Sequence, residues 1–289
     1  MKRFSIIICL LVTTTAFAQD WDKVEIKTHL VRGSIYMLEG PGGNIGVSVG
    51  DDGIVVVDDK YAPLVPKITE ALAEIADTPV RFVLNTHWHG DHTGGNELLG
   101  ESAPIIAHHN VRKRLGEGMD LPDQKVEPAP AGALPVITFS DNLSIHLNGE
   151  EVRAIHMPAA HTDGDAVIYF ASSNVVHLGD TFFSGLFPYI DIDSGGSSDG
   201  LIAGLEAVFR ELDDDVILIP GHGPISKKED LQRYLEMIKA TRVIVKDAVS
   251  AGKSTEQILS ENLLADYESW SWSFISTERW VRTLVRELG

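Results

Sequence analysis

The stretch Thr86–Asn96 constrains this chain more than any other part of its sequence. It follows an apolar run, Val80–Leu84, that predicts a buried strand. Four side chains able to bind a metal ion lie within six residues of each other: His87, His89, Asp91 and His92. The first two histidines are two residues apart and project to the same side of an extended segment, and a glycine then turns the next pair toward a second ion. Burying these groups together is costly unless a cation neutralises and orients them, so the stretch predicts a metal site.

Three more potential ligands lie at junctions between predicted strands and loops. His161 comes just before one predicted strand, and Asp180 and His222 each come just after another. Taken singly, an aspartate in a turn or a histidine between glycines is an ordinary structural residue. Together with the first cluster these residues complete two sets of histidine and aspartate ligands. Neutral imidazoles and carboxylates suit Zn²⁺, so we expect two zinc ions.

The order of the predicted elements indicates an α/β protein. Strands are expected at Val24–Leu30, Ser34–Leu38, Ile45–Val49, Ile54–Val57, Val80–Leu84, Ile105–Ile106, Val136–Phe139, Leu143–Leu147, Glu151–Ile155, Ala166–Phe170, Val175–Leu178 and Val216–Ile219. Helices are expected over Pro63–Ala76, His108–Leu115, from Ser198 or Asp199 to Leu212, and nearly throughout from Lys227 to the end, with a helix start at Thr93–Asn96. Gly116–Pro135 and Asp180–Gly200 predict long loops, the first a surface loop that could cover the site.

Both halves of the chain follow one plan, with a meander of strands, a helix, a further strand and ligands at strand ends. Two sheets packed face to face with helices outside fit this order. The predicted architecture is therefore a four-layer α/β/β/α sandwich, and residues 19–289 are expected to form one domain.

The first 18 residues predict a secretory signal peptide. A basic start, the apolar stretch Phe4–Val12 and the small residues Ala16 and Ala18 predict cleavage after Ala18. We therefore expect a periplasmic or secreted protein. The apolar stretch is too short to span a bilayer, which takes about 20 apolar residues, so no membrane insertion is expected after cleavage. Cleavage removes Cys9, the only cysteine, and leaves no thiolate to bind a metal.

The charge balance argues against nucleic acid as a partner. The chain has 24 Lys and Arg against 42 Asp and Glu, for a net charge of −18. Nucleic-acid binding requires a basic surface, and acidity of this kind mainly serves solubility. We expect a small-molecule substrate and leave the oligomeric state open.

The ordered set of these ligands resembles the metallo-β-lactamase superfamily over essentially the whole mature chain. The resemblance implies the α/β/β/α fold and an assignment of each ligand. It implies that a first zinc is held by His87, His89 and His161 and a second by Asp91, His92 and His222, with Asp180 bridging them. Asp58, at the end of the predicted strand Ile54–Val57, resembles the aspartate that orients the ligand imidazoles in this family.

The implied chemistry is hydrolysis by a hydroxide bound to two zinc ions. Such a hydroxide attacks a carbonyl or phosphoryl group, and Asp91 would act as the catalytic residue that orients it. An exported dizinc member of this family resembles the class B β-lactamases, so a β-lactam or a related cyclic amide or ester is the expected substrate. Glu39–Ile45 occupies the place of the substrate flap in those enzymes. Contacts to the substrate are expected from Trp88, Asn44, Phe187 and Tyr189.

Two departures keep other substrates open. The best-known lactamases have Cys where this chain has Asp180, and a Lys where it has Phe183. Asp180 is more similar to the ligand of glyoxalase II-type thioesterases and lactonases, so a hydrolase of lactones, thioesters or phosphodiesters is the alternative. An iron-dependent enzyme like the persulfide dioxygenases and a non-catalytic zinc-binding protein are further alternatives, and the complete ligand set disfavours both.

Overall fold

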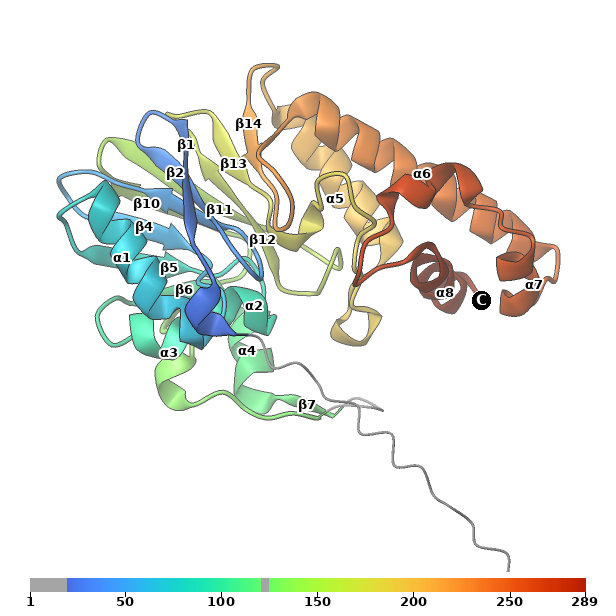
Figure 1. The fold of residues 1–289 in the computed structure, drawn as a ribbon, viewed down its shortest axis with the longest axis horizontal. Coiled ribbons are helices and arrows are strands. Elements are labelled where there is room, and N and C mark those ends of the chain that lie inside the picture. The colour runs from blue at the N-terminus through green and yellow to red at the C-terminus, as the bar shows by residue number, and fades with distance from the viewer. Residues whose placement is uncertain (1–19, 121–124) are drawn as a thin grey trace, which may run out of the picture.

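The computed structural model describes residues 20–120 and 125–289 (Figure 1). The predicted signal peptide, residues 1–18, with Cys9, lies outside the described residues. Two sheets lie face to face and helices cover their outer sides, which confirms the predicted α/β/β/α sandwich.

The first sheet is built from the N-terminal half of the chain. Its strands, in spatial order, are β1 (Lys27–Arg32), β2 (Ile35–Glu39), β3 (Ile45–Ser48), β4 (Ile54–Val57), β5 (Val80–Leu84), β6 (Ile105–His108) and β9 (Ile137–Phe139). Strands β1 to β4 form an antiparallel meander. Helix α1 (Val65–Ile75) then connects β4 to the parallel strand β5. The sheet therefore carries the start of the ligand run at the carboxyl end of β5.

The second sheet repeats this plan. Its strands, in spatial order, are β10 (Asn142–Leu147), β11 (Glu150–Met157), β12 (Asp165–Phe170), β13 (Val175–His177), β14 (Ile217–Ile219) and β15 (Ser226–Lys227). Strands β10 to β13 form an antiparallel meander, and α5 (Ser198–Glu211) leads into β14, which is parallel to β13. The predicted duplication of meander, helix and parallel strand is confirmed in the topology.

The remaining helices flank the sheets and the metal-ligand loops. They are α2 (Gly90–Thr93), α3 (Asn96–Leu99), α4 (His109–Glu117), α6 (Lys228–Ser250), α7 (Thr255–Ser260) and α8 (Thr277–Leu288). The short 3₁₀ turns are η1 (Trp21–Lys23), η2 (Ala62–Leu64), η3 (Ala131–Ala133), η4 (Gly179–Thr181), η5 (Ile192–Ser194) and η6 (Ala265–Trp270). In Figure 1, α1 covers the outer face of the first sheet, and α5, α6 and α8 lie on the far side of the second.

The core is layered as the strand patterns require. All four residues of β4 are buried, because its alternate side chains face two different layers. Val55 and Val57 pack between the two sheets, and Val56 packs against α1. Helix α1 buries Ile68, Leu72 and their neighbours at helical spacing, and a proline in its first turn suits its start.

Two local predictions were wrong and one was incomplete. The helix start expected at Thr93–Asn96 is found at Asn96, where α3 begins, but a separate short helix, α2, already begins at Gly90. The predicted loop Gly116–Pro135 contains the paired strands β7 (Met119–Asp120) and β8 (Lys125–Val126). Its Met119 and Val126 pack near Trp88 rather than over the metal ligands. The C-terminal segment is not one run of helix, because Ser271–Ser276 separates η6 from α8.

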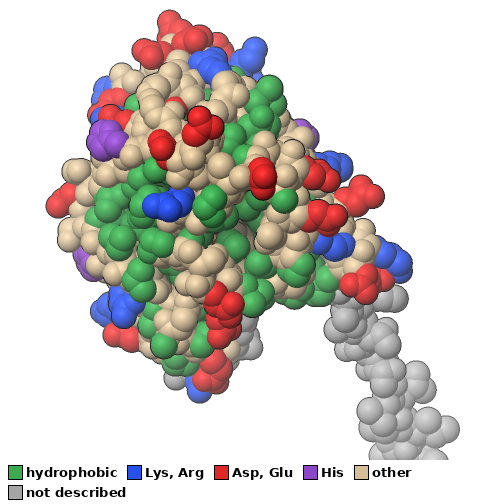
Figure 2. Space-filling model, turned by 90° about the vertical axis from the view of Figure 1, so that its left-hand side faces the viewer, with side chains coloured by type: hydrophobic (Ala, Val, Ile, Leu, Met, Phe, Trp, Pro, Cys, Tyr) green, Lys and Arg blue, Asp and Glu red, His purple; other side chains and the backbone are tan. Residues whose placement is uncertain are grey.

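The surface agrees with the acidic composition. On the face shown in Figure 2, acidic side chains are scattered over the molecule and the basic ones form no continuous area. Among the described residues, the helices are too short or too polar to cross a membrane.

Candidate metal centre

Four connections bring all seven predicted ligands together. They are the β5–α2 segment, the β11–β12 connection, η4 after β13, and the loop that follows β14. The ligand atoms fall into two groups, each within 4.8 Å: His87, His89, His161 and Asp180 in the first, and Asp91, His92 and His222 in the second. Each ligand stands beside a buried strand or a short helix, so the sandwich positions it rigidly.

Asp180 lies between the two groups. Its Oδ2 atom is 3.8 Å from Nε2 of His87 and 3.7 Å from Nε2 of His161. Its Oδ1 atom is 3.0 Å from Nε2 of His92 and 3.3 Å from Nε2 of His222. One carboxylate therefore presents a different oxygen to each group.

The buried polar atoms of this cluster fit a cation. Nε2 of His87, Nε2 of His92 and Oδ1 of Asp180 are buried and have no hydrogen-bond partner within the described chain. An unpaired buried polar atom costs about 1–3 kcal/mol, so three of them at one point need a common partner. Metal ions held by the two groups would accept these lone pairs.

The ionisation of four of the ligands also suits a metal site. Burial holds the pKa of His87 well below its usual value and lowers the pKa of His161 to about 4, so both imidazoles are neutral ligands. Burial alone would raise the pKa of Asp180, but His222 and His92 outweigh it and hold that pKa well below its usual range. Burial likewise opposes ionisation of Asp91, and His92 and His222 nevertheless lower its pKa to about 2.

A second layer of hydrogen bonds orients the imidazoles. Asp58, whose role was predicted, lies with Oδ2 2.7 Å from Nδ1 of His92. Nδ1 of His161 donates to the backbone carbonyl of Tyr189 at 2.7 Å, and Asp191 lies 2.9 Å from Nε2 of His89. Partners of this kind select the ring nitrogen that faces a metal.

Asp191 was missed by the sequence analysis. It is buried in the long loop after η4, and its other oxygen accepts a hydrogen bond from the backbone N–H of Ser194. Burial raises its pKa, but the bonds from His89 and Ser194 prevail and bring that pKa to about 2. The sequence Asp191-Ile-Asp193-Ser carries an N-cap signal for η5 but nothing that points to a histidine 102 residues away.

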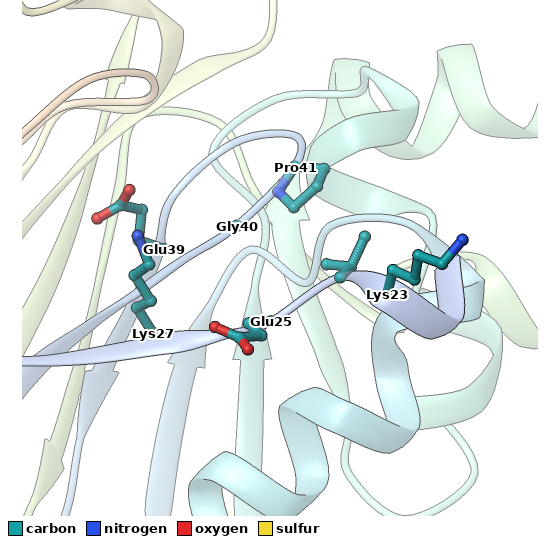
Figure 3. A pocket seen from close by; sticks show the side chains of 7 residues that line it. Lys23, Glu25, Lys27, Glu39, Gly40 and Pro41 are labelled. Carbon is teal, nitrogen blue, oxygen red and sulfur yellow. The ribbon is translucent and has the colours of Figure 1, made fainter. Parts of the chain in front are cut away.

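A glycine-rich connection between β2 and β3 closes one side of the centre. Gly43 lies so near His92 that a side-chain carbon added to it would meet that ring at 2.0 Å. The ammonium group of Lys60, fully buried, donates to the backbone carbonyls of Gly40 and Gly43. A surface pocket on the outside of this connection is lined by Lys23, Glu25, Lys27, Glu39 and Pro41 and contains none of the ligands (Figure 3).

Three of the four predicted substrate contacts point into the protein. Trp88 is only 6% exposed and packs with Ala107 and Val111. Phe187 is fully buried in the core cluster that includes Trp280. The amide of Asn44 donates to two carbonyls of the loop that carries His222, at 3.0 and 2.9 Å. These three residues therefore build the site's frame, because their side chains are buried within the fold.

Tyr189 is the one of the four that stands beside the ligands. Its ring centroid is 5.6 Å from that of His89 and 5.5 Å from that of His161. Phe183, in place of a lysine, is buried and stacks on His222 at 5.2 Å with an interplanar angle of 6°. The face of His222 is thus covered by a ring and not by a cation.

Residues 35–222 match the model of the metallo-beta-lactamase superfamily. The chain belongs to this superfamily. The match covers more than half of the chain and includes every ligand of the centre. The predicted family membership and fold are therefore confirmed, and the chain is a metal-binding hydrolase of the metallo-β-lactamase superfamily.

Proteins similar to this chain differ in what they are named for. The chain is 25% identical over 239 residues to the 2,4-dinitroanisole O-demethylase subunit alpha of Nocardioides sp. (strain JS1661), covering 81% of this chain and 68% of that protein. It is 30% identical over 142 residues to the hydroxyacylglutathione hydrolase of Gloeobacter violaceus, covering 47% of this chain and 50% of that protein. The chain thus spans half the length of this second relative.

A solved structure shows the same fold. The DIM-1 metallo-beta-lactamase superposes with a TM-score of 0.63 at 18% identity, over 76% of this chain and 100% of that chain. At this identity the likeness concerns the arrangement of sheets and helices.

Proposed function

We propose that this chain is a dizinc hydrolase that attacks the carbonyl carbon of an ester, thioester or cyclic amide. The observation that carries the proposal is the position of Asp180, whose two oxygens face different groups of imidazoles. A carboxylate shared in this way favours two ions over one. When bound, two zinc ions would lower the pKa of a shared water toward about 7 and polarise the substrate carbonyl.

The seven ligands would hold two ions. His87, His89 and His161 would hold one ion and Asp91, His92 and His222 the other, with Asp180 between them. Asp91 is the most exposed of them, so its carboxylate can also orient an attacking water and receive its proton. No protein nucleophile is required.

Among carbonyl substrates, we place thioesters and esters ahead of β-lactams. Asp180 supports this order because it replaces the cysteine of the best-known lactamases. Phe183 supports it as well, because its ring covers His222 where those enzymes use a lysine to hold the carboxylate of the drug. The relative named for hydrolysing hydroxyacylglutathione points the same way.

The first experiment measures metal content and turnover together. The protein from Gln19 onward would be purified without chelator and offered a thioester, a lactone, an aryl ester and a chromogenic cephalosporin in parallel. An activated aryl methyl ether is included because of the O-demethylase relative. We expect about two zinc ions per chain and chelator-sensitive hydrolysis of the thioester or esters, since a shared water needs both ions.

Each other result selects a different function. Cephalosporin hydrolysis at a comparable rate would restore the β-lactamase assignment. One iron per chain with oxygen-dependent activity would replace hydrolysis by persulfide-dioxygenase-like chemistry. Turnover that survives complete removal of metal would contradict the proposal.

We further propose that the protein is exported to the periplasm. The basic start, apolar stretch and small residues before Gln19 support this proposal. Intact mass of the protein recovered from a periplasmic fraction is expected to begin at Gln19. A chain that stays in the cytoplasm with Met1 or Lys2 at its start would contradict it.

A further inference from the structure

Three of the seven ligands of the metal centre are partly exposed. The side chains of His89, Asp91 and His222 are 17%, 20% and 17% exposed, whereas the other four ligands are nearly or fully buried. A substrate must therefore approach across the mouth defined by these three residues.

An arc of aromatic rings borders this mouth. The ring of Trp272 lies 5.9 Å from that of His222, and Phe274 lies 5.5 Å from Trp272. Phe274 in turn lies 5.3 Å from Tyr189, which lies 5.6 Å from His89. The arc thus runs without a break from an exposed ligand of one group to an exposed ligand of the other.

The segment that supplies the middle of the arc is fixed in place. The indole N–H of Trp272 donates to the carbonyl of Phe187 at 3.0 Å, and its backbone N–H donates to Ile275, which is buried. Figure 1 shows the red segment before α8 beside the loop that precedes α5. Phe274 nevertheless stays 45% exposed. A large aromatic side chain held open beside a reaction centre is available to a ligand.

A cation stands at the outer end of the arc. The guanidinium carbon of Arg279 is 4.2 Å from the ring centroid of Phe274 and 5.4 Å from that of Tyr189. Two other arginines of α8 form ion pairs, Arg282 with Glu278 and Glu256, and Arg286 with Asp193. Within residues 20–120 and 125–289, Arg279 pairs with no carboxylate. The one hydrogen bond of its guanidinium there, to the carbonyl of Phe274, leaves donors for a ligand.

We propose that Trp272, Phe274 and Arg279 form a recognition surface for a substrate with a flat aromatic group that carries a negative charge at its far end. The ring packs against Phe274 and Trp272, the anion pairs with Arg279, and the scissile carbonyl reaches the mouth at His89 and His222. All three residues lie beyond the segment 35–222 that the superfamily model matches. This surface deepens the proposed hydrolase and rests on that function for the identity of its ligand as substrate.

The test uses binding, which does not depend on turnover. Terephthalate, benzoate and adipate would be titrated into the zinc-loaded protein by calorimetry. Terephthalate offers a ring and a distal anion, benzoate lacks the distal anion, and adipate lacks the ring. Terephthalate is expected to bind about threefold more tightly than benzoate, because an exposed ion pair contributes an affinity gain of about that size. It is expected to bind about tenfold more tightly than adipate, from contact with aromatic side chains.

Two substitutions separate these contributions. Arg279→Gln should abolish the preference over benzoate and keep the preference over adipate, and Phe274→Ala should do the reverse. Arg282→Gln, one turn along α8, and Val243→Ala, an exposed apolar residue on α6, serve as matched controls that keep both preferences. Equal affinities for the three acids, or preferences that survive in both variants, would overturn the recognition surface.

The binding experiment and the turnover experiment fail separately. If terephthalate binds more tightly than benzoate and adipate but no ester or thioester is hydrolysed, the proposed function is refuted and the recognition surface is supported. Hydrolysis with no preference for the charged aromatic acid would refute the surface and leave the function supported.

Discussion

The Oδ2 atom of Asp58 lies 2.7 Å from Nδ1 of His92 and accepts a hydrogen bond from the hydroxyl of Thr86 at 2.7 Å. The same hydroxyl is 3.0 Å from Nδ1 of His87. One buried carboxylate thus orients an imidazole of each ligand group, directly in one case and through a hydroxyl in the other. Asp58 adopts a φ of 65°, which costs a non-glycine residue about 1–3 kcal/mol. The backbone strain therefore lies at the residue that orients His87 and His92.

Asp58→Asn should impair both ligand groups. The amide cannot accept from His92 and Thr86 as the charged carboxylate does, so metal affinity and turnover should each fall about 10–100-fold. Competition with a zinc indicator and steady-state kinetics would measure the two effects.

Thr86 provides the internal control for this network. Thr86→Ser keeps the hydroxyl between Asp58 and His87 and should behave like the unmodified protein, whereas Thr86→Val should weaken the group that contains His87. Equal behaviour of the two variants would remove the hydroxyl from the network.

Asp191→Asn should weaken only the group that contains His89. Among the described residues, Asp191 is the one carboxylate within ion-pair distance of the His89 ring, and its Oδ2 lies 2.9 Å from Nε2. The first zinc should bind about 10–100-fold more weakly while the second is retained. Asp193→Asn, which removes a surface pair with Arg286 two residues away, is the matched control. Loss of both ions in Asp191→Asn would show a general structural effect.

Asp180→Asn should separate the two ions. An amide has one oxygen to offer, so one group loses its ligand and metal content should fall from about two ions to about one. Turnover should drop more than about 100-fold. Mutating a residue that only hydrogen-bonds to a metal ligand already lowers activity about 10–100-fold, and Asp180 is itself a ligand. Asp213→Asn, in the exposed loop after α5, is the control, and metal analysis with kinetics is the measurement. Two ions retained in Asp180→Asn would refute the bridging role.

The ligands could be predicted from the sequence because their signals are local. His87 to His92 follow one apolar strand, and Asp180 and His222 follow two others with glycines beside them, so the sheets themselves bring these residues to one edge. The same strand patterns predicted the sandwich. Asp191 could not be found in this way, because its approach to His89 depends on the path of a long loop.

The errors have an equally physical origin. Nothing in the periodicity of a loop tells whether Asn44 or Phe187 points outward, and both turn inward to satisfy carbonyls or fill the core. The break at Ser271–Ser276 did leave a signal, because Ser276 caps α8 by accepting from the backbone N–H of Arg279. This cap predicts a new helix start at Ser276, and therefore a non-helical segment before it that carries Phe274.

Lys60→Met should loosen the glycine connection. The variant leaves the carbonyls of Gly40 and Gly43 without their charged donor, at a cost of about 1.5–3 kcal/mol for each bond. Because Gly43 packs on His92, turnover should fall together with stability. Hydrogen exchange in residues 40–44 should become faster.

Lys67→Met is a close control for this change. Lys67 also donates to two backbone carbonyls, those of Asp22 and Val24, at a place remote from the ligands. It should lower stability without lowering turnover. The same kinetic loss in both variants would assign the effect of Lys60 to general destabilisation.

Phe187→Ala should act on stability and not on substrate binding. Phe187 is fully buried and its ring centroid lies 6.0 Å from that of Trp280. Its backbone N–H donates to the carbonyl of Trp270, and its carbonyl accepts from the indole N–H of Trp272. Truncating a buried phenylalanine costs about 3–5 kcal/mol, so the midpoint of denaturant unfolding should drop sharply. Under conditions where the variant stays folded, its KM should match that of the unmodified protein. A raised KM with unchanged stability would show that Phe187 contacts the substrate, as the sequence predicted, and would require its side chain to turn out of the core.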